Sequence, residues 1–254
     1  VLGTANVLMA ATLAKGRTII ESAACEPEIT DLANCLNAMG ARVTGIGSPR
    51  LVIDGVSHLH PVQYRVIPDR IEAGTFMAAA AITGGEVHIS HCRLEDMMAV
   101  VDRLRIIGIA VEPNGDGCTV AGAESFEPAD ITTQPYPGFP TDLQAPIGTL
   151  LTQAHGESSI HETMYDARLL YVGELQKMGA DIGVLAQTAV IKGPCALRGT
   201  QVRALDIRSG AAVILATLVA EGTSEISGVG LVDRGYDGID VKLAALGARI
   251  RRVD

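Results

Sequence analysis

The chain has 254 residues, of which 48% are hydrophobic and 19% are charged. This composition supplies a core for one large domain or two small ones, and it carries too little charge for a disordered chain. The net charge of −9, the absence of tryptophan and the small number of other aromatic residues make nucleic acid an unexpected partner. No apolar run approaches the roughly 18 residues of a membrane helix, so we expect a soluble, cytoplasmic protein without a membrane partner.

The predicted elements recur in the same order along the chain. A helical run at 5–15 precedes Gly16 and a short strand at 18–20, and a helix at 29–39 then ends at Gly40 before strands at 42–45 and 51–53. The same order returns three times. The later strands are expected at 87–89, 110–112, 118–120, 159–160, 181–184, 189–192 and 225–226, with a last one containing Ile250.

Two glycine marks define this repeat. The first follows a small apolar helix, and its positions (Gly16, Gly85, Gly156, Gly222) are separated by 69, 71 and 66 residues. The second ends a helix of the form L-x-x-[M/I/L]-G at Gly40, Gly108, Gly179 and Gly247, which lie 24, 23, 23 and 25 residues after the first marks. Each unit therefore predicts the order β-α-β-α-β-β, with a glycine in the left-handed conformation at each helix end.

The two ends of the chain interrupt this order. The first unit begins at its helix without a preceding strand or an initiating methionine, and the fourth ends just after its Ile250 strand. An unpaired strand edge is a liability for a folded protein. We therefore expect the chain to be part of a longer arrangement.

One stretch departs from the repeat. Between Gln134 and Ala145 the sequence QPYPGFPTDLQA contains three prolines and a glycine before Asp142, which stands at a helix start. Asp142 is either a helix cap or a carboxylate held by a stiff loop for proton abstraction. From spacing alone the cap is the more common of the two.

Other charged residues also lie at helix starts or follow strands. Asp206 with Arg208, and Asp69 with Arg70, open helices in neighbouring units, where helix starts can assemble an anion site. The pairs Asp166-Arg168 and Asp233-Arg234 are more often surface ion pairs than ligand contacts. Five scattered cysteines, six histidines without ligand spacing and the lack of GxGxxG or Walker loops predict no metal and no cofactor.

Five segments carry a family resemblance: EPEITDLANCLNAMGARV, IPDRIEAGTFMAAAAITGG, PYPGFPTDLQA, ALDIRSGAAVILATLVAEGT and LVDRGYDGIDVKLAALGARI. They are similar to the UDP-N-acetylglucosamine 1-carboxyvinyltransferases, the enolpyruvyl transferases that open peptidoglycan precursor synthesis. PGFPTD and DRGY are the most specific of these motifs. The resemblance runs from Val1 to Asp254.

This resemblance implies an α/β fold, an inside-out α/β barrel of two domains with a cleft between them. Residues 1–66 would be the last repeat unit of the first domain. Residues 67–254 would be the second domain, in units of about 67–132, 133–198 and 199–254, the last incomplete. It also implies that a preceding N-terminal part, which carries other reactive residues, is the partner of this chain, and that the chain is inactive alone.

The resemblance assigns the site residues as follows. Asp142 corresponds to the general base on the sugar hydroxyl, and Arg234 to an arginine that binds phosphoenolpyruvate. Arg208 and Asp206 belong to the same network, and Arg168 lies beside the cleft. Met164 contacts the nucleotide sugar through its backbone, and Val1 borders a stretch that contacts the diphosphate.

The implied reaction transfers the enolpyruvyl group from phosphoenolpyruvate to UDP-N-acetylglucosamine and releases phosphate. Three departures from the family pattern stand near these residues: Pro146 follows Gln144-Ala145, Ala167 precedes Arg168, and Ser209-Gly210 follows Arg208. Two alternatives remain open at this point. They are a 3-phosphoshikimate 1-carboxyvinyltransferase-like enzyme and a noncatalytic relative that binds a nucleotide sugar.

Overall fold

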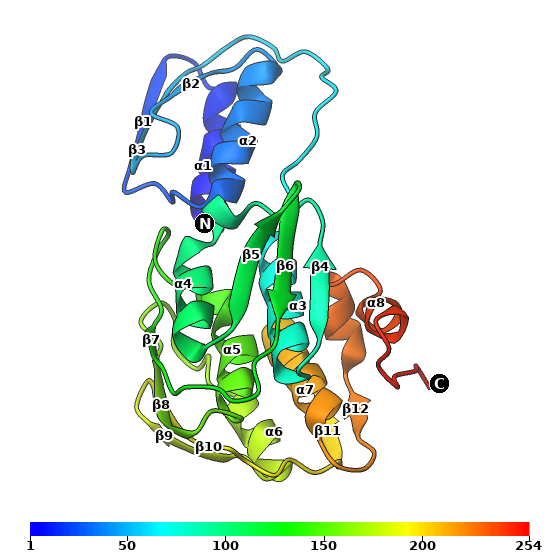
Figure 1. Cartoon of the computed structure of the whole chain (residues 1–254). Helices are drawn as coiled ribbons and strands as arrows, with labels where there is room; N and C mark the ends of the chain where they lie inside the picture. The colour runs from blue at the N-terminus through cyan, green and yellow to red at the C-terminus, as the bar shows by residue number, and fades with distance from the viewer. Residues whose placement is uncertain (254) are drawn as a thin grey trace. The chain divides into compact units, whose positions relative to one another are not determined.

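The computed structural model describes residues 1–253 and divides into two compact units (Figure 1). The first unit contains Val1–Pro68 and Pro135–Gly138, and the second contains Asp69–Gln134 and the described residues from Phe139 onward. The division after Pro68 stands beside the domain boundary expected after residue 66. That these units belong to two domains of a longer protein stays a prediction.

The elements alternate along the chain as the repeat requires. The helices are α1 (Leu2–Thr12), α2 (Pro27–Ala38), α3 (Arg70–Ile82), α4 (Met98–Ile107), α5 (Gln144–Leu151), α6 (Tyr171–Lys177), α7 (Ile207–Val219) and α8 (Ile239–Ala245), with 3₁₀ turns η1 (Leu94–Asp96), η2 (Thr141–Leu143) and η3 (Val229–Arg234). The strands are β1 (Arg17–Glu21), β2 (Arg42–Thr44), β3 (Arg50–Asp54), β4 (Glu86–Ile89), β5 (Ala110–Asn114), β6 (Gly117–Ala121), β7 (Asp130–Thr132), β8 (Gly156–His161), β9 (Asp181–Leu185), β10 (Thr188–Gly193), β11 (Gln201–Arg203) and β12 (Glu225–Ser227).

The first unit is one antiparallel sheet covered by two helices. Its strands lie in the order β1-β3-β2, and Thr18 of β1 pairs with Ile53 of β3. The inward residues Leu51 and Ile53 of β3 pack with Leu8 of α1 and Ala33 of α2 in a buried cluster. The alternating burial of β3 places these apolar side chains on the face that the helices cover.

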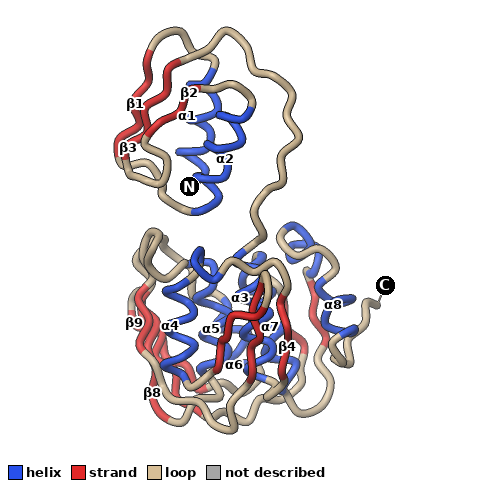
Figure 2. Tube along the Cα trace, turned by 45° about the horizontal axis from the view of Figure 1, so that its top comes forward, coloured by secondary structure: helices blue, strands red, loops and turns tan. Residues whose placement is uncertain are grey.

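The second unit contains three sheets. Their strand orders are β4-β6-β5, β7-β8-β10-β9 and β11-β12. The strands before α5 and α7 each pair in parallel with the strand that follows the helix, β7 with β8 and β11 with β12. A parallel pair needs such a crossover connection, which here is the helix of the repeat. Figure 2 shows α3, α5 and α7 between the strands β8 and β9 on one side and β4 on the other.

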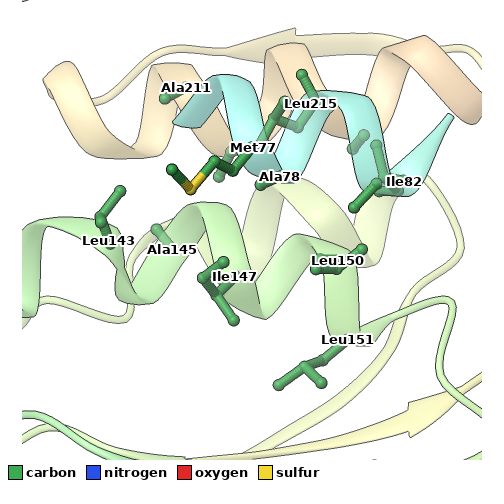
Figure 3. Packing of buried hydrophobic residues seen from close by; sticks show 14 of the residues in the cluster. Met77, Ala78, Ile82, Leu143, Ala145, Ile147, Leu150, Leu151, Ala211 and Leu215 are labelled. Atoms are coloured by element: carbon green, nitrogen blue, oxygen red, sulfur yellow. The ribbon is translucent and has the colours of Figure 1, made fainter. Parts of the chain in front are cut away.

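Three helices form the centre of the second unit. All eight residues of α5 are buried, as are Ser209–Ala216 of α7 and most of α3. Met77 of α3, Ile147 and Leu150 of α5 and Leu215 of α7 belong to one buried cluster, and Figure 3 shows Met77 in the space between α3 and α5. A helix that is buried all round must be apolar on every face, and the alanines of α3 and α7 let the helix backbones approach closely. The inside-out arrangement of central helices and outer sheets is therefore confirmed.

The second glycine of each repeat ends a helix by one hydrogen-bonding pattern. These glycines have φ values of 98°, 100°, 99° and 103° at positions 40, 108, 179 and 247. In each case the next residue donates its N–H to the carbonyl of the leucine four residues before the glycine: Leu36, Leu104, Leu175 and Leu243. This is a Schellman ending, which needs a left-handed residue after the helix and a buried apolar residue in its last turn. The motif L-x-x-[M/I/L]-G therefore encodes a helix end.

Several expected elements differ from the structure. Among the described residues, 248–253 form no strand, so the predicted Ile250 strand is wrong. Ile250 packs its side chain against the core, and no neighbouring strand pairs with its backbone. The second repeat lacks an opening strand, because residues 55–69 include Pro61 and Pro68, which have no N–H to donate to a ladder. The first helix also ends at Thr12, three residues earlier than expected.

Candidate active site

Asp142 lies at the end of the proline-rich loop, in the 3₁₀ turn η2 that leads into α5. The predicted role as a side-chain helix cap is wrong, because no side chain caps the start of η2 or of α5. Its side chain is instead 47% exposed and forms two ion pairs. The position of Asp142 therefore serves a polar cluster rather than the local helix.

Two arginines meet at one oxygen of Asp142. Nη1 of Arg168 lies 2.6 Å from Asp142 Oδ1, and Nη1 of Arg208 lies 3.1 Å from the same atom. In the described part of the chain Oδ2 has no hydrogen-bond partner. The guanidinium groups thus orient the carboxylate while one oxygen stays open to accept a proton.

Asp206 links this cluster to α7. Its carboxylate accepts a hydrogen bond from the Ser209 backbone at 2.7 Å, and the Ser209 hydroxyl accepts one from the Asp206 backbone, which completes a capping box. Arg208 Nη2 lies 2.5 Å from Asp206 Oδ2. Burial raises the pKa of Asp206, but the Ser209 backbone bond and the Arg208 charge outweigh it, and the net pKa is lowered. Asp206 is therefore both a helix cap and a partner that orients Arg208.

Arg168 is held from three sides. Its guanidinium lies over the Tyr165 ring at 4.1 Å from the centroid, and Nη1 is 3.2 Å from the Thr141 hydroxyl. Its backbone carbonyl accepts a hydrogen bond from the buried Gln144 side chain at 3.1 Å. Since Gln144 is the first residue of α5, this hydrogen bond joins the helix start directly to the Arg168 loop.

Two of the three departures from the family pattern differ in how well the local backbone accommodates them. Pro146 is the third residue of α5, where the N–H that it lacks would have no partner within the helix. Ala167 has a φ of +56°, a left-handed conformation that asparagine adopts more easily than alanine. The proline therefore costs the helix no hydrogen bond, whereas the alanine is under backbone strain.

Arg234 lies in a motif whose other members are anchored. Asp233 forms a bidentate ion pair with Arg252, at 2.8 and 2.5 Å, and the buried Tyr236 hydroxyl bonds Thr75 of α3 at 2.8 Å. Within residues 1–253 the exposed Arg234 side chain forms no hydrogen bond or ion pair. The motif therefore presents one unpaired cation from a fixed turn.

The Tyr236 hydroxyl also links this turn to α3, which packs against the turn η2 that carries Asp142. Burial raises the pKa of Tyr236 to about 12, the Thr75 hydrogen bond lowers it, and the charges of Asp69, Asp142 and Glu72 raise it. The DRGY turn and Asp142 thus belong to one region of the second unit.

The remaining predicted residues lie outside the ion-pair cluster. Met164 follows β8, and its N–H donates to Glu162 Oε1 at 2.7 Å. Its backbone carbonyl has no partner among residues 1–253. Val1 belongs to the first unit and is exposed there, with its carbonyl bonded to the Ala5 N–H at 3.0 Å. The roles assigned to all these residues stay predictions.

Sequence reasoning overlooked Glu162. Its side chain is 1% exposed and accepts a hydrogen bond from Thr141, the residue before Asp142. A signal was present in the register of β8, because Ser158, Ile160 and Glu162 alternate on one buried face. A carboxylate at a core position predicts that several donors surround it.

No group of three or more His, Cys, Asp or Glu side chains in residues 1–253 could hold a metal ion. No helix in that range is both long and apolar enough to cross a membrane.

The family and the curated relatives that match this chain are all named as 1-carboxyvinyltransferases. The EPSP synthase (3-phosphoshikimate 1-carboxyvinyltransferase) family matches residues 1–243. The UDP-N-acetylglucosamine 1-carboxyvinyltransferase of Desulforapulum autotrophicum is 50% identical over 254 residues, which are 100% of this chain and 61% of that protein. UDP-N-acetylglucosamine 1-carboxyvinyltransferase 2 of Bacillus cereus is 47% identical over 249 residues, which are 98% of this chain and 58% of that protein. The chain thus spans about three fifths of the length of these curated relatives.

Solved structures agree on the fold. The enolpyruvyl transferase NikO from Streptomyces tendae has a TM-score of 0.88 at 26% identity, over 96% of this chain and 58% of that one. EPSP synthase from Acinetobacter baumannii has a TM-score of 0.70 at 21% identity, over 95% and 59%. The second likeness concerns the fold alone.

Proposed function

The chain belongs to the EPSP synthase family of enolpyruvyl transferases, and we propose that it supplies part of a UDP-N-acetylglucosamine 1-carboxyvinyltransferase. In this proposal the longer protein transfers the enolpyruvyl group from phosphoenolpyruvate to the 3′-hydroxyl of UDP-N-acetylglucosamine and releases phosphate, a step in peptidoglycan precursor synthesis. Support comes from the relatives named above, which carry this name at about half identity over nearly the whole chain.

The observation that carries the proposal is the state of the Asp142 carboxylate. Oδ1 is held by Arg168 and Arg208, while Oδ2 has no partner in residues 1–253. Such a carboxylate can accept the proton of the sugar hydroxyl as its oxygen attacks C2 of the enolpyruvyl group. A fixed base improves this step because the geometry is set before the reaction.

The cations have a separate task in the proposed reaction. Phosphoenolpyruvate brings a carboxylate and a phosphate, and arginine forms bidentate contacts with both kinds of anion. Arg234 has an unpaired guanidinium, and Arg208 stands between Asp142 and Asp206. We assign Arg234 to the anionic substrate and Arg208 to the orientation of Asp142. The proton that C3 receives, and the one it loses when phosphate leaves, need a group that we do not assign to this chain.

Domain organisation and location are parts of the same proposal. Residues 1–66 would complete one domain together with a preceding segment, and residues 67–254 would form most of the other. Met164 and Val1 would contact the nucleotide sugar and its diphosphate. A cytoplasmic location agrees with substrates that are phosphorylated and too polar to cross a bilayer unaided.

The test is phosphate release from phosphoenolpyruvate with two acceptors. The chain alone and the chain extended upstream to the length of its relatives would each be given UDP-N-acetylglucosamine or shikimate 3-phosphate. We expect phosphate release only from the extended chain, and only when UDP-N-acetylglucosamine is the acceptor. Release with shikimate 3-phosphate would favour the other enolpyruvyl transferase activity, and no release with either acceptor would favour a binding protein.

A further inference from the structure

Glu162 is a buried carboxylate without a cation. Its side chain is 1% exposed, and in residues 1–253 no lysine, arginine or histidine pairs with it. An unpaired carboxylate in a protein interior is costly unless hydrogen bonds compensate for the lost water. Glu162 therefore needs several hydrogen-bond donors, and their positions show which segments of the chain the carboxylate connects.

Four donors surround the carboxylate. Oε1 accepts the Thr133 hydroxyl at 2.9 Å, the Met164 N–H at 2.7 Å and the Tyr165 N–H at 3.2 Å. Oε2 accepts the Thr141 hydroxyl at 2.7 Å. Both oxygens are occupied, so the carboxylate has a specified position.

The donors come from three separate segments. Thr133 follows β7, Thr141 begins η2 at the end of the proline-rich loop, and Met164 with Tyr165 follows β8. Thr133 also accepts the Thr163 N–H at 2.9 Å, which adds a second link between the ends of β7 and β8. One side chain thus ties together the two loops that carry the Asp142 and Arg168 side chains.

A short chain of contacts connects Glu162 to the site. The Thr141 hydroxyl donates a hydrogen bond to Glu162 Oε2 and accepts a hydrogen bond from Arg168 Nη1 at 3.2 Å. The same Nη1 lies 2.6 Å from Asp142 Oδ1. Because a hydroxyl has one proton, its donation to Glu162 leaves its lone pairs directed at the arginine.

We propose that Glu162 is a positioning residue, whose buried carboxylate sets the geometry of Asp142 and Arg168 through Thr141 and the Met164–Tyr165 backbone. The consequence for the reaction rests on the proposed function, whereas the positioning itself does not. Glu162 does not touch the substrates in this proposal.

Glutamine is the informative replacement because it keeps the shape of the side chain. Its single carbonyl oxygen can replace only one of the carboxylate oxygens. If the carbonyl serves the two N–H donors and Thr133, the amide group faces Thr141 and donates to it. The Thr141 hydroxyl then accepts from both the amide and Arg168, and its own proton loses its acceptor. Glu162→Gln therefore loosens the contact on which Arg168 depends.

The experiment uses the chain extended upstream to the length of its relatives. Its variants are Glu162→Gln, Thr141→Val and Thr141→Ser, and the matched control is Glu157→Gln. Glu157 lies in the same strand, β8, and its exposed side chain pairs with Lys192 at 3.6 Å. Two readouts are taken from each variant. They are kcat and KM for phosphate release, and the hydrogen exchange of the Met164 and Tyr165 amides.

We expect Glu162→Gln to lower kcat by on the order of 10²-fold with little change in KM, since a displaced base loses rate before it loses affinity. It should also speed exchange of the Met164 and Tyr165 amides, because a neutral amide carbonyl is a weaker acceptor for their N–H groups than the carboxylate that it replaces. Thr141→Val should lower kcat but leave that exchange unchanged, whereas Thr141→Ser should behave as the parent. A double variant that combines Glu162→Gln with Thr141→Val should be no slower than Glu162→Gln alone, because both changes break the same connection.

Three results would overturn the proposal: an unchanged kcat in Glu162→Gln, unchanged exchange of the two amides in that variant, or equal losses in Thr141→Ser and Thr141→Val. If Glu162→Gln fails to fold, the comparison of kcat between Thr141→Ser and Thr141→Val tests the proposal instead. If the parent releases no phosphate, the proposed function has failed, and the exchange arm still decides whether Glu162 holds the two loops.

Discussion

Ala167 offers a direct test of backbone strain beside the site. Its φ is +56°, and a residue with a Cβ in this region pays about 1–2 kcal/mol relative to the right-handed conformation. Asparagine tolerates the conformation better because its short polar side chain bonds the local backbone. We expect Ala167→Asn to raise the free energy of unfolding by about 0.5–1 kcal/mol, which corresponds to a rise in Tm of about 1–4 °C for a domain of this size.

Two other alanines provide matched controls. Ala186 has a φ of +52° in the turn between β9 and β10, so Ala186→Asn should show a similar gain away from the site. Ala196 is exposed in a loop and is not left-handed, so Ala196→Asn should show none. Thermal unfolding followed by circular dichroism, at one protein concentration and scan rate, compares all three. If Ala167→Asn melts at or below the parent while Ala186→Asn melts above it, the reasoning about Ala167 is refuted.

The remaining predictions concern charge. Asp142→Asn keeps the arginine contacts but cannot accept a proton, so kcat for phosphate release should fall by on the order of 10²–10⁴-fold, and an unchanged kcat would exclude Asp142 as the base. Arg252→Ala removes the ion pair of Asp233 and should raise the KM for phosphoenolpyruvate by loosening the turn that carries Arg234, with kcat retained; equal KM values would show that the ion pair has no such role. The lowered pKa of Asp206 stabilises the fold above the unfolded-state value of about 4, and this contribution is lost as the pH falls through the lower folded-state value. Urea unfolding should therefore show Asp206→Asn to be less stable than the parent at pH 7 and closer to it at pH 3, and a pH-independent difference would contradict the assignment.

The repeat could be predicted well because its signals are local. The leucine and glycine of L-x-x-[M/I/L]-G lie four residues apart, and all the hydrogen bonds of the Schellman ending fall within six residues. The Ile250 strand failed for the opposite reason. A strand exists only through a partner elsewhere in the chain, and local β-branched character does not supply one.

The amino-acid sequence by itself determined the helix ends, most strand positions, the family resemblance and the identities of the candidate residues. Only the tertiary structure decided that Arg168 and Arg208 meet at a single oxygen atom of Asp142. These arginines lie 26 and 66 residues after the aspartate in the sequence. It also showed that the buried Glu162 carboxylate accepts hydrogen bonds from the loops that carry Asp142 and Arg168. The physical reason is that helix endings depend on hydrogen bonds between near neighbours, whereas the site depends on how α5, α7 and the β8–α6 loop pack, and packing joins residues that the sequence keeps apart.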